Sequence, residues 1–299
     1  MPSPPPSNMP HFYCPHRNIT PDGRFILPPD ESRHLAVVLR IKKGDAISIF
    51  DGKGNSFRAV VTDIEYMDKK SYAGEVMVSG RITDKNCAAS KDLSSYEQPG
   101  KFFRRAYTDE NVEINFYQAI PKKQKIEDII DKLSQLGISS VTPVITARTI
   151  VKISQPSERA AKLKRWRAVA LASSKQSLRS DIMQVKEILT FEEAVRLLKD
   201  AEHNFPTIIA WEGEKDKNLS VTIKEIKSIF KRHQQTFALN VFIGPEGGFD
   251  FHKEIEYARA NLKDIFTVGL GDNILRADTA AIMLASVLVY EFNLEGSGI

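Results

Sequence analysis

The stretch FIGPEGGFDF, residues 242–251, passes from apolar side chains to a cluster of glycine, proline and glutamate, and then to a segment with helical character. Glycine at the junction of a strand and a helix lets the chain turn sharply and lets another group approach the backbone closely. Two questions follow: which fold surrounds this junction, and which group approaches it.

Strands and helices are predicted to alternate from Val112 onwards. Apolar, strand-like runs occupy residues 112–120, 139–146, 207–211, 238–244 and 264–271. Helices are predicted at residues 126–136, with Gly137 as C-cap, and from about residues 157, 190, 221, 251 and 277. The helix at Thr190 opens with the capping box TFEE. This alternation with short connections favours an α/β fold with a mostly parallel sheet that is covered on both faces.

The N-terminal part carries β signals from Phe25 to about Arg81. The runs DAISIF (45–50) and FRAVV (57–61) flank the turn sequence DGKG, which predicts a hairpin. A short helix is expected around Glu31 to Leu39, and a small β-barrel is the simplest architecture for this part.

Composition then suggests how the chain divides. Residues 1–8 have the Pro/Ser content of a disordered tail, and residues 82–111 are polar and aperiodic, as in a loop or insertion. We therefore expect a tail at 1–8, a small β domain at 9–81, a linker or insertion at 82–111 and an α/β domain at 112–299. Two domains also agree with the length of 299 residues.

Composition and charge exclude several classes of protein. No apolar run approaches the roughly 20 residues of a membrane span, and no signal peptide opens the chain, which predicts a cytoplasmic protein. The two cysteines and six histidines lack metal-ligand spacing, so we predict no metal site. A net charge of +4 and a pI near 8.9 permit a polyanionic partner without demanding one.

Three unusual loops follow predicted strands in the last third of the chain. They contain WEGEK (211–215), GPEGG (244–248) and GDNILRADTA (271–280). In an open parallel sheet, ligands bind where loops leave the carboxyl ends of the strands, so these loops are predicted to wall one pocket. GPEGG matches neither nucleotide-binding fingerprint. The alternative is that its glycines only permit a sharp turn.

The loop before the last helix carries Arg276 and Asp278 beside Thr279. The following helix is almost wholly apolar on one face and is predicted to be buried. We expect the fold to hold the Arg276 guanidinium at the helix entrance. The alternative is a structural ion pair of Arg276 with Asp278 or Glu246.

One segment is rich in positive charge and has Glu158 as its only acidic residue. A field of this kind attracts polyphosphates by counterion release, although a solvated helix face is the alternative. Trp166 recurs at core spacing with apolar neighbours, and is predicted to be core rather than a platform for base stacking. The basic residues are Arg148, Lys152, Arg159, Lys162, Lys164, Arg165, Arg167, Lys175 and Arg179.

The motifs resemble those of the RsmE family, the bacterial 16S ribosomal RNA (uracil-N3)-methyltransferases of the SPOUT superfamily. The C-terminal signature consists of IGPEGG (243–248), LG (270–271) and ILRADTA (274–280). Earlier motifs follow in the family's order: MPHFY from Met9, HLAVVLRIKKGD (34–45), AIPK (119–122), LSQLGISSVTPV (133–144) and KQSLR (175–179). The resemblance covers nearly the whole chain except the tail and residues 82–111.

The chain also departs from the family pattern. The family usually has Glu where Gln135, Lys175 and Asp278 stand, and Pro near Met183. Asp278 keeps its charge on a shorter side chain, so we expect the site to survive. Lys175 reverses a charge, which affects the expected RNA contacts.

The resemblance implies a C-terminal trefoil knot, a PUA-like N-terminal β-barrel that helps to hold RNA, and a homodimer that shapes the active site. It also implies bound S-adenosylmethionine (SAM) in the knotted loops and small-subunit ribosomal RNA as the substrate. The glycines of GPEGG would let the backbone approach the cofactor. The residues implied to bind SAM are Trp211, Glu212, Ile243, Gly244, Pro245, Glu246, Gly247, Gly248, Leu270, Gly271, Ile274, Leu275 and Thr279.

Chemistry then suggests roles for individual residues. The N3 atom of uracil is a poor nucleophile until its proton leaves, so a cation near the base oxygens would stabilise the anion, and Arg276 is the candidate. Glu246 would accept the proton, hold Arg276 or face the sulfonium charge. The candidates for RNA contact are Arg148, Lys164, Arg165, Gln176 and Arg179.

Two other functions remain open at this point. An RNA-binding ribosome-assembly protein could keep the fold without the chemistry, and the departures at Gln135 and Lys175 leave room for it. A nucleotide hydrolase is disfavoured, because GPEGG lacks the phosphate-binding lysine and no set of metal-binding carboxylates is evident.

Overall fold

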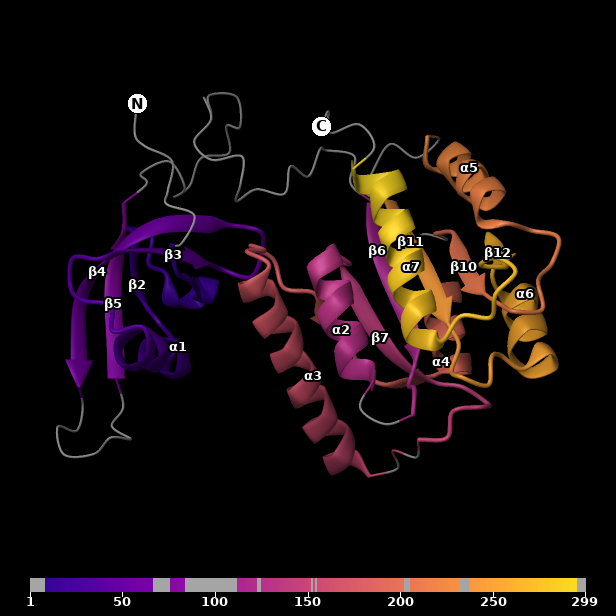
Figure 1. The fold of residues 1–299 in the computed structure, drawn as a ribbon, viewed down its shortest axis with the longest axis horizontal. Coiled ribbons are helices and arrows are strands. Elements are labelled where there is room, and N and C mark those ends of the chain that lie inside the picture. Colours follow the sequence, from indigo (N-terminus) through magenta and orange to yellow (C-terminus); the bar gives the residue numbers. More distant parts are fainter. Residues whose placement is uncertain are drawn as a thin grey trace. The chain divides into compact units, whose positions relative to one another are not determined.

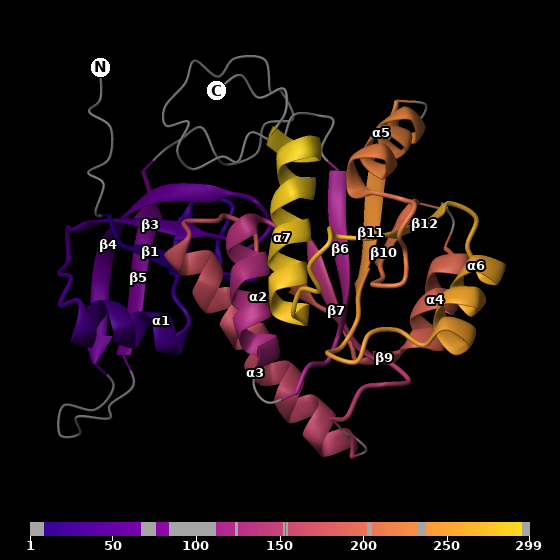
Figure 2. The ribbon, with the colours of Figure 1, turned by 45° about the vertical axis from the view of Figure 1, so that its right-hand side comes forward.

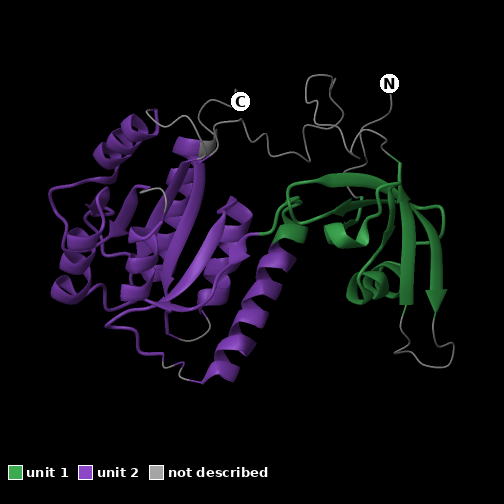
Figure 3. Ribbon diagram, turned by 180° about the vertical axis from the view of Figure 1, so that it is seen from behind, with its two compact units in different colours: residues 1–106, 174–182 green, residues 107–173, 183–299 purple. Residues whose placement is uncertain are grey.

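The computed structural model describes residues 9–66, 76–83, 112–122, 125–151, 153, 155–201, 205–231 and 237–294. The predicted tail, most of the predicted insertion and Lys152 lie outside these residues. The chain separates into two compact units, coloured separately in Figure 3. Unit 1 comprises residues 1–106 and 174–182, and unit 2 comprises residues 107–173 and 183–299. The expectation that all residues from 112 onwards form one domain therefore differs from the structure at 174–182.

Unit 2 contains a seven-stranded sheet whose described strand pairs are all parallel. Its strands run in the order β12-β10-β11-β6-β7-β8, and β9 also pairs with β7. The predicted mostly parallel sheet is confirmed. The strand bounds are β6 Val112–Ala119, β7 Ser140–Ile145, β8 Gln184–Val185, β9 Leu189–Thr190, β10 Thr207–Ala210, β11 Phe237–Ile243 and β12 Ile265–Val268.

Helices cover both faces of this sheet (Figures 1 and 2). Helices α2 (Lys125–Leu136) and α7 (Ala277–Val289) lie on one face, and α4 (Phe191–Lys199) and α6 (Glu256–Asn261) lie on the other. Every residue of β11 is buried, as expected for a strand between two helical layers. Helix α3 (Pro156–Gln176) packs on α2, and α5 (Leu219–Phe230) lies near β12. The trefoil knot stays a prediction.

Local sequence explains where these helices begin and end. The Thr190 side chain and Glu193 form the predicted capping box of α4. Gly137 ends α2 with φ +89°, a left-handed conformation that glycine adopts at little cost. The Asp250 side chain caps the π-helical turn Phe251–Ile255 that precedes α6 by accepting a bond from the Lys253 N–H. The predicted helix starts are therefore confirmed to within a few residues.

Unit 1 is built around a five-stranded sheet in the order β1-β3-β4-β5-β2. The strands are β1 His11–Tyr13, β2 Arg24–Ile26, β3 Ala46–Phe50, β4 Ser56–Tyr66 and β5 Val76–Ile82. All described pairs are antiparallel except β1 with β3, and the predicted hairpin of β3 and β4 is confirmed. The predicted short helix is present as α1 (Pro29–Arg33) followed by a π-helical turn at His34–Val38.

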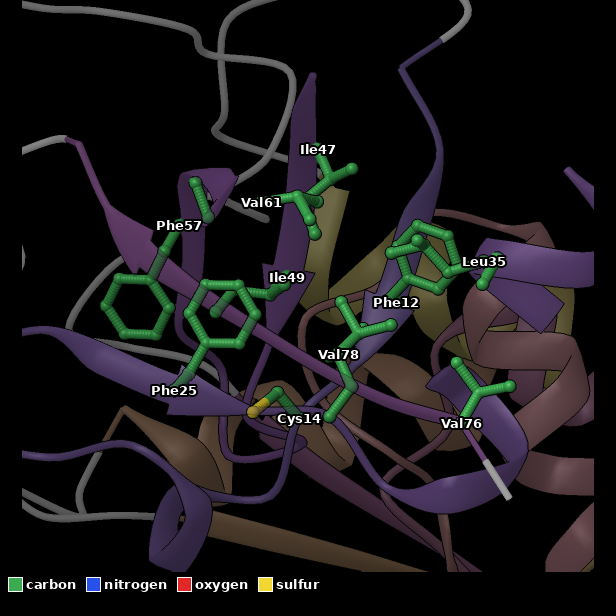
Figure 4. Close-up of a cluster of buried hydrophobic side chains, with 13 residues drawn as sticks. Phe12, Cys14, Phe25, Leu35, Ile47, Ile49, Phe57, Val61, Val76 and Val78 are labelled. Carbon is green, nitrogen blue, oxygen red and sulfur yellow. The ribbon is translucent and has the colours of Figure 1, made fainter. Parts of the chain in front are cut away.

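The core of unit 1 lies on the inner side of this sheet. Phe12, Phe25 and Leu35 are buried among the side chains of β3, β4 and β5 (Figure 4). Gly80 on β5 faces Phe25, and a Cβ at this glycine would lie 2.6 Å from the carbonyl oxygen of Val60. Aromatic packing on this strand therefore depends on the absence of a side chain at residue 80.

Residues 174–182 belong to unit 1 through specific polar contacts. The Lys175 ammonium lies 2.7 Å from the carboxylate of Glu31, which is buried on α1. The Gly54 N–H donates to the Ser180 carbonyl (3.1 Å), and the Ile182 N–H donates to the Gly52 carbonyl (3.3 Å). Lys175, one of the departures from the family pattern, is therefore a structural ion-pair partner within this unit.

Burial of His11 makes the stability of unit 1 depend on pH. Its ring stacks on Phe50 at 4.4 Å between centroids, and burial lowers its pKa from 6.5 to about 4. The unfolded chain therefore binds a proton between these pH values while the folded chain does not. The contribution of His11 to the free energy of unfolding is therefore complete above pH 6.5 and is lost as the pH drops towards 4, by at most about 3 kcal/mol.

We expect His11→Phe to keep the stacking and to flatten this pH dependence. Differential scanning calorimetry at pH 7 and pH 4 checks it, with His252→Gln as a control at an exposed histidine. If the unfolding temperatures of the wild type and His11→Phe changed equally between pH 7 and pH 4, His11 would not be the source of the pH dependence.

Candidate functional site

The register of three neighbouring strands places the predicted loops at one edge of the unit 2 sheet. Ala210 at the end of β10 pairs with Ile243 of β11 and with Val268 of β12. Because all three strands are parallel, residues 211–217, 244–250 and 269–276 leave the sheet side by side. We refer to these segments as the three loops. The segment after β6 leaves at the same edge, since Gln118 pairs with Ile243.

Backbone contacts join the first and third loops. The Trp211 N–H donates to the Val268 carbonyl (3.0 Å), and the Gly269 N–H donates to the Lys217 carbonyl (3.2 Å). A Cβ at Gly269 would lie only 2.6 Å from the Glu214 carbonyl oxygen. Gly269 is therefore required by the close approach of the two loops.

Glu214 braces the same pair of loops from within. Its carboxylate accepts the hydroxyl of Thr267 on β12 (2.6 Å) and lies 3.5 Å from the guanidinium of Arg259. The Thr267 hydroxyl and the backbone N–H groups of Asp216 and Lys217 hold the pKa of Glu214 below its usual value. An ionised, hydrogen-bonded carboxylate of this kind fixes the loop after β10.

The second loop, which carries GPEGG, is approached by side chains of the protein itself. Gly248 has φ +67°, and a Cβ at this position would overlap the Glu212 carboxylate. The Arg148 guanidinium donates to the Gly247 carbonyl (2.8 Å) and lies 3.8 Å from Asp250. Two charged side chains of the protein itself, Glu212 and Arg148, therefore lie against these glycines.

Glu254 ties the second loop to the segment after β7. It is 1% exposed, and its two carboxylate oxygens accept the N–H groups of Ala147 (2.8 Å) and Asp250 (2.7 Å). Burial raises the pKa of Glu254, and the two N–H donors oppose this shift. Glu254 thus positions Arg148, which follows Ala147, against Gly247.

Glu246 joins the second loop to the segment after β6. Its carboxylate accepts the Lys122 N–H at 3.0 and 3.4 Å, and its side chain is exposed. No ion pair between Glu246 and Arg276 is present among the described residues. The alternative in which Glu246 holds Arg276 therefore has no support in this conformation.

Arg276 stands at the N-terminus of α7 with an exposed side chain. Its carbonyl accepts the Ala280 N–H (2.8 Å), so the backbone is fixed. Within the described part of the chain, the guanidinium has no hydrogen bond or ion pair. The expectations that the fold holds the guanidinium, or that Asp278 pairs with it, are wrong for the described residues. Asp278 instead lies 3.5 Å from Lys125 on α2.

The predicted burial of α7 is confirmed. Ala281, Leu284, Ala285 and Leu288 are each 0% exposed. The third loop before this helix is open: Ile274 is 88% exposed, and Gly271 has φ +113°, where an added Cβ would meet no atom within 4 Å. An exposed isoleucine beside this open stretch of backbone is a surface that a flat apolar ring system can cover.

The remaining predicted cofactor residues lie in the same three loops or at their bases. Trp211 is half-buried and stacks on Phe251 at 5.4 Å between centroids. Ile243 and Pro245 are buried, Leu270 and Leu275 are half-buried, and Thr279 is exposed on the first turn of α7. The structure thus brings the predicted set to one edge of the sheet: Trp211, Glu212, Ile243, Gly244, Pro245, Glu246, Gly247, Gly248, Leu270, Gly271, Ile274, Leu275, Arg276 and Thr279.

The basic segment is largely neutralised by acidic partners. Arg165 lies 2.6 Å from Glu127, and Arg167 lies 2.8 Å from Glu187. Lys164 is exposed and has no such partner among the described residues. Trp166 is 2% exposed, which confirms that it belongs to the core.

Two predicted RNA contacts fall outside the three loops, near the end of α3. Gln176 is exposed, whereas Arg179 is 8% exposed and pairs with Asp181. Both residues belong to unit 1. Because the Arg179 side chain is buried and paired with Asp181, it is not available to contact RNA in this conformation.

Sequence reasoning missed the residues that brace the loops, namely Lys122, Glu214, Glu254, Arg259 and Thr267. Only a partial signal existed for Glu254, since a capping box has its glutamate three residues after the N-cap, whereas Glu254 lies four residues after the N-cap Asp250. Nothing in the local sequence marks Thr267 as the partner of Glu214, because the two belong to different strand ends.

We expect Glu254→Gln to loosen the second loop. A glutamine amide would present an NH₂ group to one of the two backbone N–H donors, which leaves a buried donor unpaired at a cost of about 1–3 kcal/mol. Thermal unfolding and hydrogen exchange of residues 147–150 and 244–250 measure this effect. Glu256→Gln, at an exposed position on α6, is the matched control, and equal stability of the two variants would contradict the bracing role.

Metal ligands and membrane spans can be assessed for the described residues. They contain no group of three or more His, Cys, Asp or Glu side chains that could hold a metal ion. No helix in the described segments is both long and apolar enough to cross a membrane.

Two family models match consecutive parts of the chain. Residues 108–289 match the model of an RNA methyltransferase domain, and residues 27–66 match that of an RNA methyltransferase PUA domain. Two relatives named ribosomal RNA small subunit methyltransferase E are similar in sequence. The protein from Bacillus subtilis is 28% identical over 63% of this chain and 71% of its own length. The one from Rickettsia conorii is 26% identical over 87% of each chain.

Solved structures share the fold. A ribosomal RNA small subunit methyltransferase E from Neisseria gonorrhoeae, bound to S-adenosyl methionine, has a TM-score of 0.68 at 24% identity, over 94% of this chain and 97% of that one. A second protein, from Legionella pneumophila and also in complex with SAM, gives the same values. The match to the domain model covers more than half of the chain, and with the three loops at one sheet edge the chain belongs to the RNA methyltransferase family.

Proposed function

We propose that the protein transfers a methyl group from SAM to the N3 atom of a uridine in small-subunit (16S) ribosomal RNA. The observation that carries this proposal is the common register of β10, β11 and β12, which gathers the three loops at one edge. Membership of the RNA methyltransferase family supports the reaction class. The names of the relatives support ribosomal RNA as the substrate, and the motif resemblance supports N3.

The residues of the three loops fit SAM. Exposed Ile274 and the open space at Gly271 suit an adenine ring, and the backbone of the third loop offers donors and acceptors to its edge. The exposed carboxylates of Glu212 and Glu246 suit a cationic sulfonium. When bound, SAM supplies an electrophilic methyl group that needs no activation by a metal.

The protein's task is then to position the uracil and to stabilise its anion. Arg276 is the proposed catalytic residue, because its guanidinium is exposed beside the third loop and has no partner among the described residues. A free guanidinium can donate to a uracil oxygen and stabilise the negative charge that develops when N3 loses its proton. Glu246 is the proposed acceptor of that proton or the counter-charge of the sulfonium.

We further propose that the enzyme is a homodimer that acts in the cytoplasm, where ribosomal RNA is found. Support for the dimer comes from the family resemblance, which implies a second copy that shapes the active site. A trefoil knot formed by the C-terminal segment is part of the same proposal.

Mass mapping of methylated uridines in ribosomal RNA tests the proposed activity. RNA from cells with and without this protein is compared, and we expect one N3-methyluridine of the small subunit to disappear with the protein. Calorimetric titration with SAM accompanies it. An unchanged methylation map together with no binding heat would favour the RNA-binding assembly protein instead.

Replacement of Arg276 tests the catalytic assignment. Arg276→Ala removes one preorganised charge donor, so methyl transfer should fall by roughly 10²-fold or more. SAM affinity should stay within a few-fold, because the loop backbone is unchanged. Arg196→Ala, at an exposed arginine on α4, is the control. Normal turnover of Arg276→Ala on small-subunit RNA would remove Arg276 from the mechanism.

Replacement of Lys164 and Arg165, the exposed basic pair on α3, tests the proposed RNA contact. Lys164→Gln should lower RNA affinity and flatten its salt dependence by about one counterion. Arg165→Gln should have a smaller effect, since Glu127 already pairs with Arg165. Binding isotherms at several salt concentrations, with the double variant included, measure both. An unchanged slope in the double variant would leave these residues as solvated surface.

A further inference from the structure

Arg276 keeps an unpaired guanidinium although acidic side chains lie near it in the sequence. Two carboxylates are the natural candidates to pair with it: Glu246 of the second loop and Asp278 of the first turn of α7. Neither does so in the described part of the chain. Arginine and carboxylate pair readily, because the two groups match in charge and in geometry. Other groups hold these carboxylates instead.

The segment after β6 supplies a partner for each carboxylate. The Lys122 N–H donates to the Glu246 carboxylate (3.0 Å), and the Lys125 ammonium at the start of α2 lies 3.5 Å from Asp278. This segment leaves the sheet at the edge where the three loops lie. Both anions are thus held by residues that follow one strand, and for Asp278 the holding group is a side chain that can be replaced.

Asp278 is held at both of its carboxylate oxygens. One oxygen faces Lys125, and the other accepts the N–H of Thr279 (3.0 Å). Partial burial opposes ionisation, but these two donors keep the pKa of Asp278 below its usual value. Because the Thr279 N–H carries no net charge, Lys125 is the group that balances the charge of Asp278.

The ion pair is not needed to join the two helices. Helices α2 and α7 lie side by side in both views (Figures 1 and 2). Each buries apolar side chains, such as Ile130 on α2 and Leu284 on α7, which are 0% exposed. The side chains of Lys125 and Asp278, in contrast, are 34% and 32% exposed. Ion pairs with this much exposure contribute little to stability, so joining the helices is a minor part of what Lys125 does.

Loss of the Lys125 charge would leave an unbalanced carboxylate beside the proposed catalytic group. Asp278 lies two residues after Arg276, at the N-terminus of the same helix. A carboxylate there attracts the guanidinium and withdraws its donors from a uracil oxygen. It also opposes the negative charge that develops when N3 loses its proton, since charges interact more strongly near a protein surface than in bulk water.

We propose that Lys125 is a positioning residue: by balancing the charge of Asp278, it keeps the Arg276 guanidinium available to the substrate. This proposal rests on the proposed function and on the catalytic role of Arg276 within it. Lys125 is assigned no contact with SAM or with the base, and acts through Asp278. The effect of removing Lys125 must therefore disappear when the charge of Asp278 is removed as well.

A cycle of neutral variants tests this dependence in the full-length protein. Lys125→Gln should lower kcat for methyl transfer to small-subunit RNA by about tenfold, the scale of one unbalanced charge near the reacting groups. Lys125→Gln/Asp278→Asn should return kcat to within about threefold of the wild type. Lys125→Gln/Asp128→Asn has the same net charge but removes an exposed carboxylate of α2, so it should stay as slow as Lys125→Gln.

Binding and stability measurements separate positioning from a structural role. SAM affinity and KM for RNA should stay within about threefold of the wild type in all three variants, and unfolding temperatures within about 3 °C, as expected for an exposed pair. Equal kcat in Lys125→Gln and the wild type would overturn the proposal. A loss in Lys125→Gln that Asp278→Asn does not reverse, or that Asp128→Asn reverses equally well, would also overturn it.

A readout without turnover separates failure of this proposal from failure of the proposed function. Phenylglyoxal modifies unpaired arginine side chains faster than paired ones, and peptide mass spectrometry measures its rate at Arg276. We expect this rate to fall by about threefold in Lys125→Gln and to recover when Asp278→Asn is added.

The two measurements together give distinct outcomes. If the modification rates follow this pattern but the wild type transfers no methyl group, the proposed function fails and the effect of Lys125 on Arg276 stands. If the wild type methylates RNA and Lys125→Gln changes neither kcat nor the modification rate, the proposal for Lys125 is overturned and the function stands.

Discussion

The parallel, in-register pairing of β10 with β11 and β12 is the constraint on which the site depends. Ala210, Ile243 and Val268 end their strands in one row, so the following loops emerge together. A slip of one residue would turn every side chain of a strand to the opposite face, and because all residues of β11 are buried, each side chain would have to repack against the other helical layer. The hydrophobic layers that bury this sheet thus also determine where the loops meet.

Carboxylates complete the arrangement that the strands begin. Glu214, Glu246 and Glu254 each accept backbone N–H groups of a loop segment. Such charge-assisted bonds hold irregular backbone in place where no ladder of strand bonds continues. The glycines have a related role: a Cβ at Gly248 would collide with Glu212, and one at Gly269 would crowd Glu214. The first and second loops and the start of the third are therefore held by contacts within the protein, which suits a site that must align a methyl donor with an acceptor.

Much of this architecture could be predicted because local sequence patterns specify the strands, the helices and the helix ends. Hydrophobic periodicity identified the longer strands and the helices of unit 2 but not the short strands β1, β8 and β9. Thr190 and Gly137 marked helix ends, and the positions of GPEGG and ILRADTA after strands located the site. Local patterns do not predict which side chains of distant segments pair with each other. The basic segment looked like a free positive field, yet Lys175 pairs with Glu31 and Arg165 with Glu127. Arg179 was expected at a surface but is buried, and residues 174–182 joined unit 1 through contacts with residues more than 100 positions away.

Hydrogen exchange with and without SAM tests the central claim most directly. If one site is built from the three loops, SAM should protect residues 211–217, 244–250 and 269–276 together and at the same SAM concentration. Protection of β6 to β8 should be unchanged, because these strands are already buried. Protection confined to one loop, or at different SAM concentrations for different loops, would contradict a shared site at this edge of the sheet.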